Sequence, residues 1–140
     1  NAQVDKFNIR RFITFLGSYS QKDAPQIYQK VDAYITMSFQ DNCPSAVIEA
    51  MSCGLPILYS SSGGIPELVG KNSGIGLKVP ENWEKVNVPT KQEIHEGILK
   101  IMANKKSMSY CARERAVKLF DIRSWIKRHE EVFDFLIKKS

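Results

Sequence analysis

Residues 41–61 read DNCPSAVIEAMSCGLPILYSS, and they pass from a loop through a helix into a strand. Pro44 and Ser45 are residue types that start helices, and Gly54 is a residue type that ends them. Residues 55–61 form a short apolar run bounded by turn residues, which is typical of a strand. A helix that runs directly into such a strand predicts an α/β fold.

Strand and helix signals alternate on both sides of this stretch. Residues 10–17 are rich in β-branched and aromatic side chains and end at Gly17, which predicts a short buried strand. Such alternation predicts right-handed crossovers and a parallel sheet, with fewer strands than a complete doubly wound domain. The predicted strands are residues 10–17, 33–38, 55–61 and 74–80, and helical signals fall within residues 23–32, 45–53 and 63–70.

From Thr90 onward the pattern is helical throughout. Thr90 and Glu93 have the spacing of a capping box. A second helix is predicted over residues 107–119, and Asp121 is a candidate cap for the last helix. The first of these helices has an apolar face made of Ile94, Ile98, Ile101 and Met102. The predicted packing face of the last helix consists of Ile122, Trp125, Ile126, His129, Phe133 and Leu136.

The chain has 140 residues, the usual size of one domain, and a formal charge of +5. Its lysines and arginines are scattered without interleaved aromatic residues, which argues against nucleic-acid binding. Its three cysteines form no paired motif. We therefore expect reduced thiols in a cytoplasmic protein, with Cys53 and Cys111 buried in helices. No apolar run approaches the length of a membrane span. Because the chain begins with Asn1, we expect it to be processed or cut from a longer one.

Three segments follow predicted strands and are therefore candidates for a ligand site. Open parallel sheets bind ligands beyond the carboxyl ends of their strands. Residues 17–19, 39–46 and 62–64 each come directly after, or at the end of, a predicted strand. We expect these segments to converge at one edge of the sheet.

Two carboxylates flank the helix start in this region. The first N–H groups of the helix have no partner within it and favour a phosphate. Glu49, one turn into the helix, can accept both hydroxyls of a ribose, and Asp41 can reach another part of the same ligand. The same placements also suit a turn residue at Asp41, a dipole-stabilised acid at Glu49 and a helix stop at Gly54.

Residues 41–69, DNCPSAVIEAMSCGLPILYSSSGGIPELV, resemble the signature region of the group 1 glycosyltransferases, a retaining family with the GT-B fold. The shared pattern is an acid, seven residues, Glu-Ala-Met, a glycine, a short apolar strand and a Gly-Gly-x-Pro-Glu turn. The resemblance extends upstream through ITFLGSYS and YQKVDAYITMS, and downstream through GIGLKVP into the helical tail. It covers nearly the whole chain.

The resemblance implies a Rossmann-like parallel sheet with flanking helices, as in the C-terminal domain of a GT-B enzyme. Residues 1–140 would form one nucleotide-sugar-binding domain, without the N-terminal part of that domain and without the acceptor domain. The complete enzyme would transfer a sugar from a nucleotide-diphosphate sugar to a glycan or lipid-linked acceptor, with retention and without a metal or other cofactor. The fragment alone would be inactive. A cytoplasmic protein with peripheral membrane contact through its last helix is expected.

The resemblance also assigns roles to single residues. Glu49 takes the place of the acid that binds the ribose, and Asp41 that of the acid near the donor sugar, which is linked to transition-state stabilisation. Most relatives have Glu where this chain has Asp41, which is shorter by one methylene. The remaining candidate donor-binding residues are Tyr19, Asn42, Cys43, Pro44, Ser45, Ala46, Gly63 and Gly64.

Two other functions stay open at this stage. A sugar-nucleotide epimerase with the GT-B fold would use a similar cleft, and it would act on the nucleotide sugar without an acceptor. A non-catalytic nucleotide-sugar-binding or scaffold domain would also fit, with Asp41 as a sign of drift.

Overall fold

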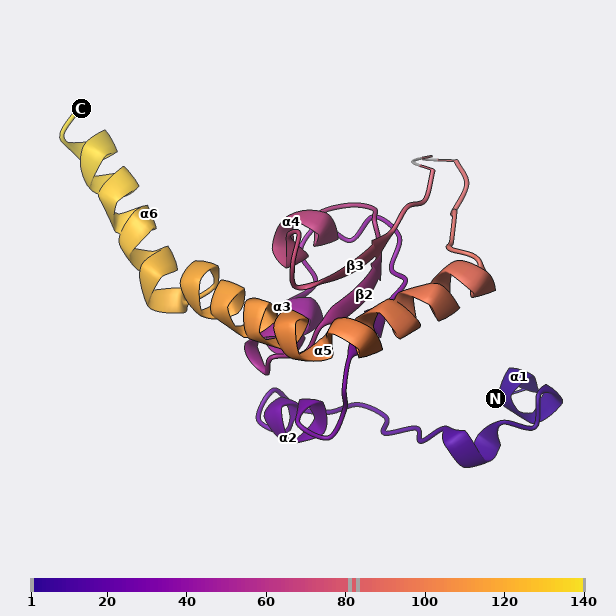
Figure 1. Cartoon of the computed structure of the whole chain (residues 1–140). Coiled ribbons are helices and arrows are strands. Elements are labelled where there is room, and N and C mark those ends of the chain that lie inside the picture. The colour runs from indigo at the N-terminus through magenta and orange to yellow at the C-terminus, as the bar shows by residue number, and fades with distance from the viewer. Residues whose placement is uncertain (1, 81, 83, 140) are drawn as a thin grey trace.

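The computed structural model describes residues 2–80, 82 and 84–139. Three short strands form its sheet: β1 (Tyr34–Thr36), β2 (Ile57–Ser60) and β3 (Gly74–Leu77). They lie in the order β1-β2-β3, and both pairings are parallel (Figure 1). The predicted parallel α/β architecture is therefore confirmed.

Helices connect the strands and extend both ends of the chain. Helix α3 (Ser45–Ser52) joins β1 to β2, and α4 (Ile65–Val69) joins β2 to β3, as the glycine and proline signals predicted. The long α5 (Lys91–Leu119) and the last helix, α6 (Ile122–Ile137), follow β3. The chain begins with α1 (Ala2–Lys6), the 3₁₀ turn η1 (Arg10–Phe12) and α2 (Ala24–Tyr28).

The central strand β2 separates two apolar clusters. Ile57 and Tyr59 face α3 and α4, where they pack against Val47 and Ile65. Leu58 faces the opposite way and packs against α5. Successive side chains of a strand point to opposite faces, so a continuous apolar run is what a strand covered on both faces requires.

Helix α5 is a single helix of 29 residues, which corrects the predicted break near residue 107. The segment around that position contains no glycine or proline, and all of its residues are compatible with a helix. The capping box of Thr90 and Glu93 at its start is confirmed. Near its other end, Arg115 Nε donates to the Leu68 carbonyl (2.7 Å), which ties α5 to the end of α4.

Residues 10–17 do not form the predicted strand. They contain η1 and an extended segment that runs from η1 toward α2, outside the sheet (Figure 1). Phe12 and Leu16 are 73% and 64% exposed. A β-prone sequence becomes a strand only beside a partner strand, and the described residues pair this segment with none. The sheet accordingly has three strands rather than four.

Helix α6 is correctly predicted as an amphipathic helix capped by Asp121, but its apolar face is not buried. None of its 16 residues, all of which the structure describes, is buried, and Trp125 is 49% exposed rather than part of the core. His129 is half-buried, and its ring stacks on Trp125 with 3.7 Å between ring centroids. Figure 1 shows α6 projecting away from the sheet.

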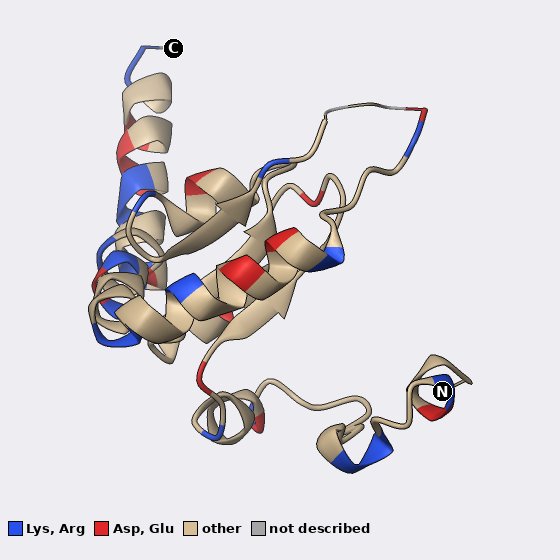
Figure 2. Cartoon of the chain, turned by 45° about the vertical axis from the view of Figure 1, so that its right-hand side comes forward, with Lys and Arg blue, Asp and Glu red and all other residues tan. Residues whose placement is uncertain are grey.

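Three further features concern the burial of the cysteines, the distribution of basic residues and the lengths of the helices. Cys53 and Cys111 are half-buried rather than fully buried. Lysines and arginines are spread over α5, α6, α1 and η1 (Figure 2). Among the described helices, none is both long enough and apolar enough to cross a bilayer.

Candidate functional site

The loop after β1 is fastened to the turn after β2. Ser62 is 2% exposed, and its hydroxyl oxygen accepts a hydrogen bond from the Gln40 N–H (3.2 Å) and donates one to the Ser38 carbonyl (3.4 Å). The Gly64 N–H donates to the carbonyl of Asp41 (3.0 Å). These bonds set the backbone position of Asp41 at the carboxyl edge of the sheet.

Both glycines of this turn are required by a close approach of two backbones. A Cβ atom on Gly64 would overlap the carbonyl oxygen of Asn42, and one on Gly63 would lie 2.6 Å from the carbonyl oxygen of Asp41. Gly63 also has a φ of +62°, which side chains disfavour. The structure thus brings four predicted site residues together: Asp41, Asn42, Gly63 and Gly64.

The start of α3 follows this loop directly. Pro44 is the N-cap residue in an extended conformation, and its carbonyl accepts a bond from the Val47 N–H (3.1 Å). No side chain caps the helix, because proline offers none. Cys43 beside it is an exposed thiol, and Ser45 and Ala46 form the first turn. The first N–H groups of α3 therefore form a positive end of the helix dipole.

Glu49 lies in the second turn of α3, half-buried against α2. The buried Tyr28 hydroxyl donates to its Oε2 (3.4 Å) and also lies 3.5 Å from the Ala46 carbonyl oxygen. Within residues 2–80, 82 and 84–139, no hydrogen bond reaches the other carboxylate oxygen, Oε1. A hollow of about 220 Å³ between α2 and α3 is lined by Tyr28 and Glu49.

Besides burial, the carboxylates of both candidate acids raise the pKa of the same residue, Tyr34. Burial is the main reason why the pKa of Tyr34 is raised, and the nearby Tyr19 hydroxyl and the carboxylates of Glu49 and Asp41 raise it further. Tyr34 stands on β1, the strand that leads into the Asp41 loop. Glu49 and Asp41 are therefore both within electrostatic range of one group.

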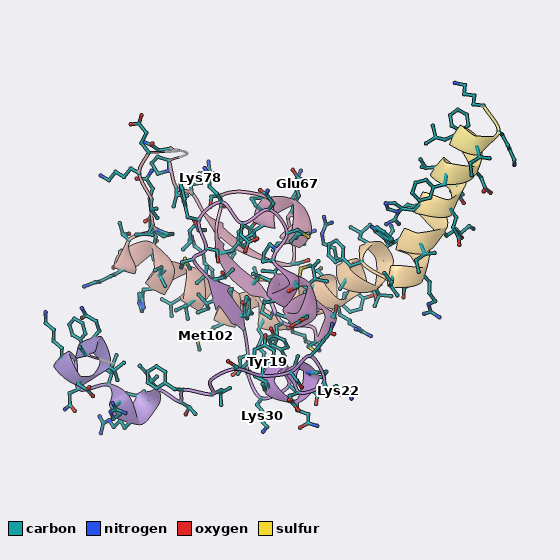
Figure 3. All side chains as sticks on the ribbon, turned by 180° about the vertical axis from the view of Figure 1, so that it is seen from behind. Tyr19, Lys22, Lys30, Glu67, Lys78 and Met102 are labelled. Carbon is teal, nitrogen blue, oxygen red and sulfur yellow. The ribbon has the colours of Figure 1, made fainter. Side chains whose placement is uncertain are left out.

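Tyr19 reaches this region by its side chain. Its hydroxyl lies 2.9 Å from the Tyr28 hydroxyl, and the two rings meet edge to face with centroids 6.3 Å apart. Figure 3 shows Tyr19 between α2 and the body of the molecule. Tyr19 thus approaches Glu49 through Tyr28. The prediction that residues 17–19 follow a strand is wrong, because no strand precedes them among the described residues. The two other predicted segments, 39–46 and 62–64, do meet at the strand ends.

Tyr28 and Ser62 both contribute to this geometry, but the sequence did not indicate a role for either. Tyr28 stood in a predicted helix whose only signal was the spacing of Ile27 and Val31. Ser62 lay in a segment of interest, but nothing in the sequence indicated that it would join two loops. The only available signal for Ser62 was its position between a strand and two glycines.

A parallel α/β unit whose loops converge at the carboxyl ends of its strands has the architecture of a Rossmann-like domain. The solved structure of sucrose-phosphate synthase from Thermosynechococcus elongatus superposes with a TM-score of 0.81 at 22% identity, over 99% of this chain and 34% of that one. Anabaena HepE in complex with UDP superposes with a TM-score of 0.79 at 21% identity, over 95% of this chain and 35% of that one.

Residues 1–116 match the family described as glycosyl transferases group 1, and the chain belongs to this family. It is 34% identical to O-antigen chain mannosyltransferase B of Escherichia coli over 48% of this chain and 18% of that protein. It is 25% identical to sucrose-phosphate synthase of Spinacia oleracea over 87% of this chain and 11% of that protein. The chain thus spans only a small part of the length of these two relatives.

Proposed function

We propose that this chain forms the donor-binding half of a retaining glycosyltransferase. The complete protein would transfer a sugar from a nucleotide-diphosphate sugar to a glycan or lipid-linked acceptor. The observation that carries the proposal is the joined pair of loops at the carboxyl ends of β1 and β2, from which α3 leads to Glu49. Family membership and the UDP complex of HepE support it.

In the proposed complex, the ribose and the diphosphate occupy different parts of α3. Glu49 has one carboxylate oxygen bonded to Tyr28, so its remaining acceptor positions are available for the two ribose hydroxyls. The N–H groups at Ser45 and Ala46 face the diphosphate, whose charge suits the positive end of the helix.

The donor sugar in this arrangement lies beside Asp41. The bond from the sugar to the diphosphate breaks, and positive charge develops on the sugar ring as negative charge develops on the departing phosphate. The helix start stabilises the leaving group, and the Asp41 carboxylate stabilises the ring. The bond from the Gly64 N–H to the Asp41 carbonyl restrains the backbone that carries this carboxylate. No metal enters the proposal.

Nucleotide binding is the first test. We expect one of UDP, GDP and ADP to raise the midpoint of thermal unfolding of the full-length protein, because a ligand present at 100 times its Kd stabilises by about 2.7 kcal/mol. UDP is the first probe because HepE was solved with it. Isothermal calorimetry gives the affinity. If none of the three nucleotides, nor any of their glucose or mannose derivatives, changes the midpoint, the donor-binding proposal is wrong.

Product analysis then separates the possible activities. With nucleotide sugar and acceptor, we expect a product whose anomeric configuration, read by NMR, equals that of the donor. Epimerised nucleotide sugar formed without acceptor would instead identify an epimerase. Nucleotide-sugar binding without any turnover would favour a non-catalytic binding domain.

Replacing Asp41 by asparagine is expected to lower kcat by about tenfold and leave the KM for the donor within about twofold. Asparagine keeps the size of the side chain but removes the negative charge that stabilises the positively charged sugar ring. Asp32→Asn is the matched control, since Asp32 is exposed and forms an ion pair with Lys105 at the surface. An effect of Asp41→Asn on KM alone would contradict the role given to this residue.

A further inference from the structure

The hydroxyl of Tyr28 occupies a position between two polar partners. It lies 2.9 Å from the Tyr19 hydroxyl on one side and 3.4 Å from Glu49 Oε2 on the other. Tyr28 is 4% exposed, whereas Tyr19 is 44% exposed. A line of hydrogen bonds therefore runs from the surface, through a buried hydroxyl, to the carboxylate of Glu49.

The ring of Tyr28 is fixed in orientation. It meets the Tyr19 ring at 82° and the Tyr34 ring at 77°, with centroids 6.3 Å and 6.0 Å apart. Both contacts are edge-to-face arrangements, which aromatic pairs favour. Tyr28 also belongs to the main apolar cluster with Val47 and Met51 of α3. Its hydroxyl is thus held in one place relative to the helix that carries Glu49.

The direction of the hydrogen bonds follows from the charge of the acceptor. The Tyr28 hydroxyl has one proton, and Glu49 Oε2 and the Ala46 carbonyl oxygen (3.5 Å) both lie within its reach. Either tyrosine hydroxyl can be the donor of their shared bond; because a charged carboxylate is the stronger acceptor, we assign the Tyr28 proton to Glu49, which leaves the Tyr28 oxygen to accept from Tyr19. Burial above all raises the pKa of Tyr28, which keeps the hydroxyl protonated as a donor.

We propose that Tyr28 is a positioning residue for Glu49, and that the Tyr19–Tyr28 hydroxyl pair holds the Glu49 carboxylate in the orientation that receives the ribose hydroxyls of the donor. The inference rests on the proposed function, because it concerns the same acid. By occupying Oε2, Tyr28 turns Oε1 and the remaining lone pairs toward the ligand. Preorganisation of this kind strengthens binding, since the carboxylate loses less freedom when the ribose arrives.

The test uses Tyr28→Phe in the full-length protein, with UDP, GDP and ADP and their 2′,3′-dideoxy analogues as probes. Phenylalanine keeps the ring contacts and removes the hydroxyl. We expect the affinity for the ribonucleotide that binds tightest to fall about fivefold to tenfold, the size expected for the loss of one typical protein hydrogen bond. The affinity for its dideoxy analogue stays within about twofold. Tyr19→Phe, at the exposed end of the line, causes a smaller change in the same direction.

Tyr59→Phe is the matched control, because Tyr59 is a similarly buried tyrosine of the same cluster at 6% exposure. It is expected to leave both affinities unchanged. In a Glu49→Ala background, Tyr28→Phe is expected to have no further effect on ribonucleotide binding. An equal loss for ribonucleotide and dideoxynucleotide, or an undiminished effect in that background, would show a purely structural role and overturn the inference.

The outcomes for the two residues are separable. If Glu49→Ala binds the ribonucleotide as tightly as the unmodified protein, the ribose role of Glu49 in the proposed function is wrong. If Glu49→Ala loses affinity but Tyr28→Phe and Tyr19→Phe do not, the proposed function stands and the positioning role of Tyr28 is wrong.

Discussion

Replacing Gly64 by alanine is expected to destabilise the protein by about 3 kcal/mol and to abolish nucleotide binding. The new methyl group would overlap the carbonyl oxygen of Asn42, so the loop or the turn must move. Overpacking costs about 1–3 kcal/mol, and the lost bond from the Gly64 N–H to Asp41 adds about 1 kcal/mol. Because Gly64 has an ordinary φ of −89°, the effect comes from this contact and not from backbone strain.

Urea unfolding and calorimetry with the nucleotide measure the two effects. Ser61→Ala is the neighbouring control, because Ser61 is half-buried and its backbone N–H bond to Leu77 survives the change. Its effect is expected to stay within about 0.5 kcal/mol. Unchanged stability and binding in Gly64→Ala would mean that the loops are not in contact as described.

Replacing Glu49 by alanine is expected to weaken nucleotide binding by more than about 100-fold. Two hydrogen bonds from ribose hydroxyls to a charged carboxylate contribute about 1.5 kcal/mol or more each, and together they amount to a factor of this size. The fold is expected to survive, because Glu49 is half-buried and the only hydrogen bond of its side chain within the described residues is the one from Tyr28. Calorimetric titration of the full-length protein gives the affinity.

Glu67→Ala provides a matched control for this change. Glu67 is an exposed acid in the first turn of α4, away from Tyr19 and α2 in Figure 3. Its carbonyl, which Arg115 contacts, is kept by the substitution. We expect nucleotide affinity within about twofold of the unmodified protein. Equal effects of the two substitutions would point to the overall charge of the domain, and an unchanged affinity in Glu49→Ala would remove Glu49 from the site.

The sequence predicted those parts of the fold whose signals are local. A proline, a serine and a glycine mark the ends of α3, and the apolar run after them marks β2. The segment 10–17 has an equally clear β-prone composition, yet it lies outside the sheet. Whether a strand forms depends on a neighbouring strand, which a local pattern cannot supply. For the same reason, the periodicity of the α6 sequence predicts an apolar face but does not identify what covers that face.

For the site as well, local signals predicted single residues but not the long-range contacts between them. Helix periodicity and family resemblance placed Glu49 and Asp41, and the structure puts both acids within range of Tyr34. The bond between Tyr28 and Glu49 joins residues 21 positions apart, and the bond between Ser62 and Gln40 joins residues 22 apart. Such contacts arise from tertiary packing, so no spacing rule in either segment points to them.

The continuity of α5 has a consequence for how the domain unfolds. Ile101 packs against one face of the sheet, whereas Ala112 and Ala116, further along the same helix, belong to the cluster on the other face. Loss of either cluster removes support from a helix on which the other cluster depends. The two faces are therefore expected to form one cooperative unit, in which amide hydrogens of α5 and β2 exchange through the same global opening. A ligand bound at the loops would slow that exchange throughout the unit, far beyond the residues it touches.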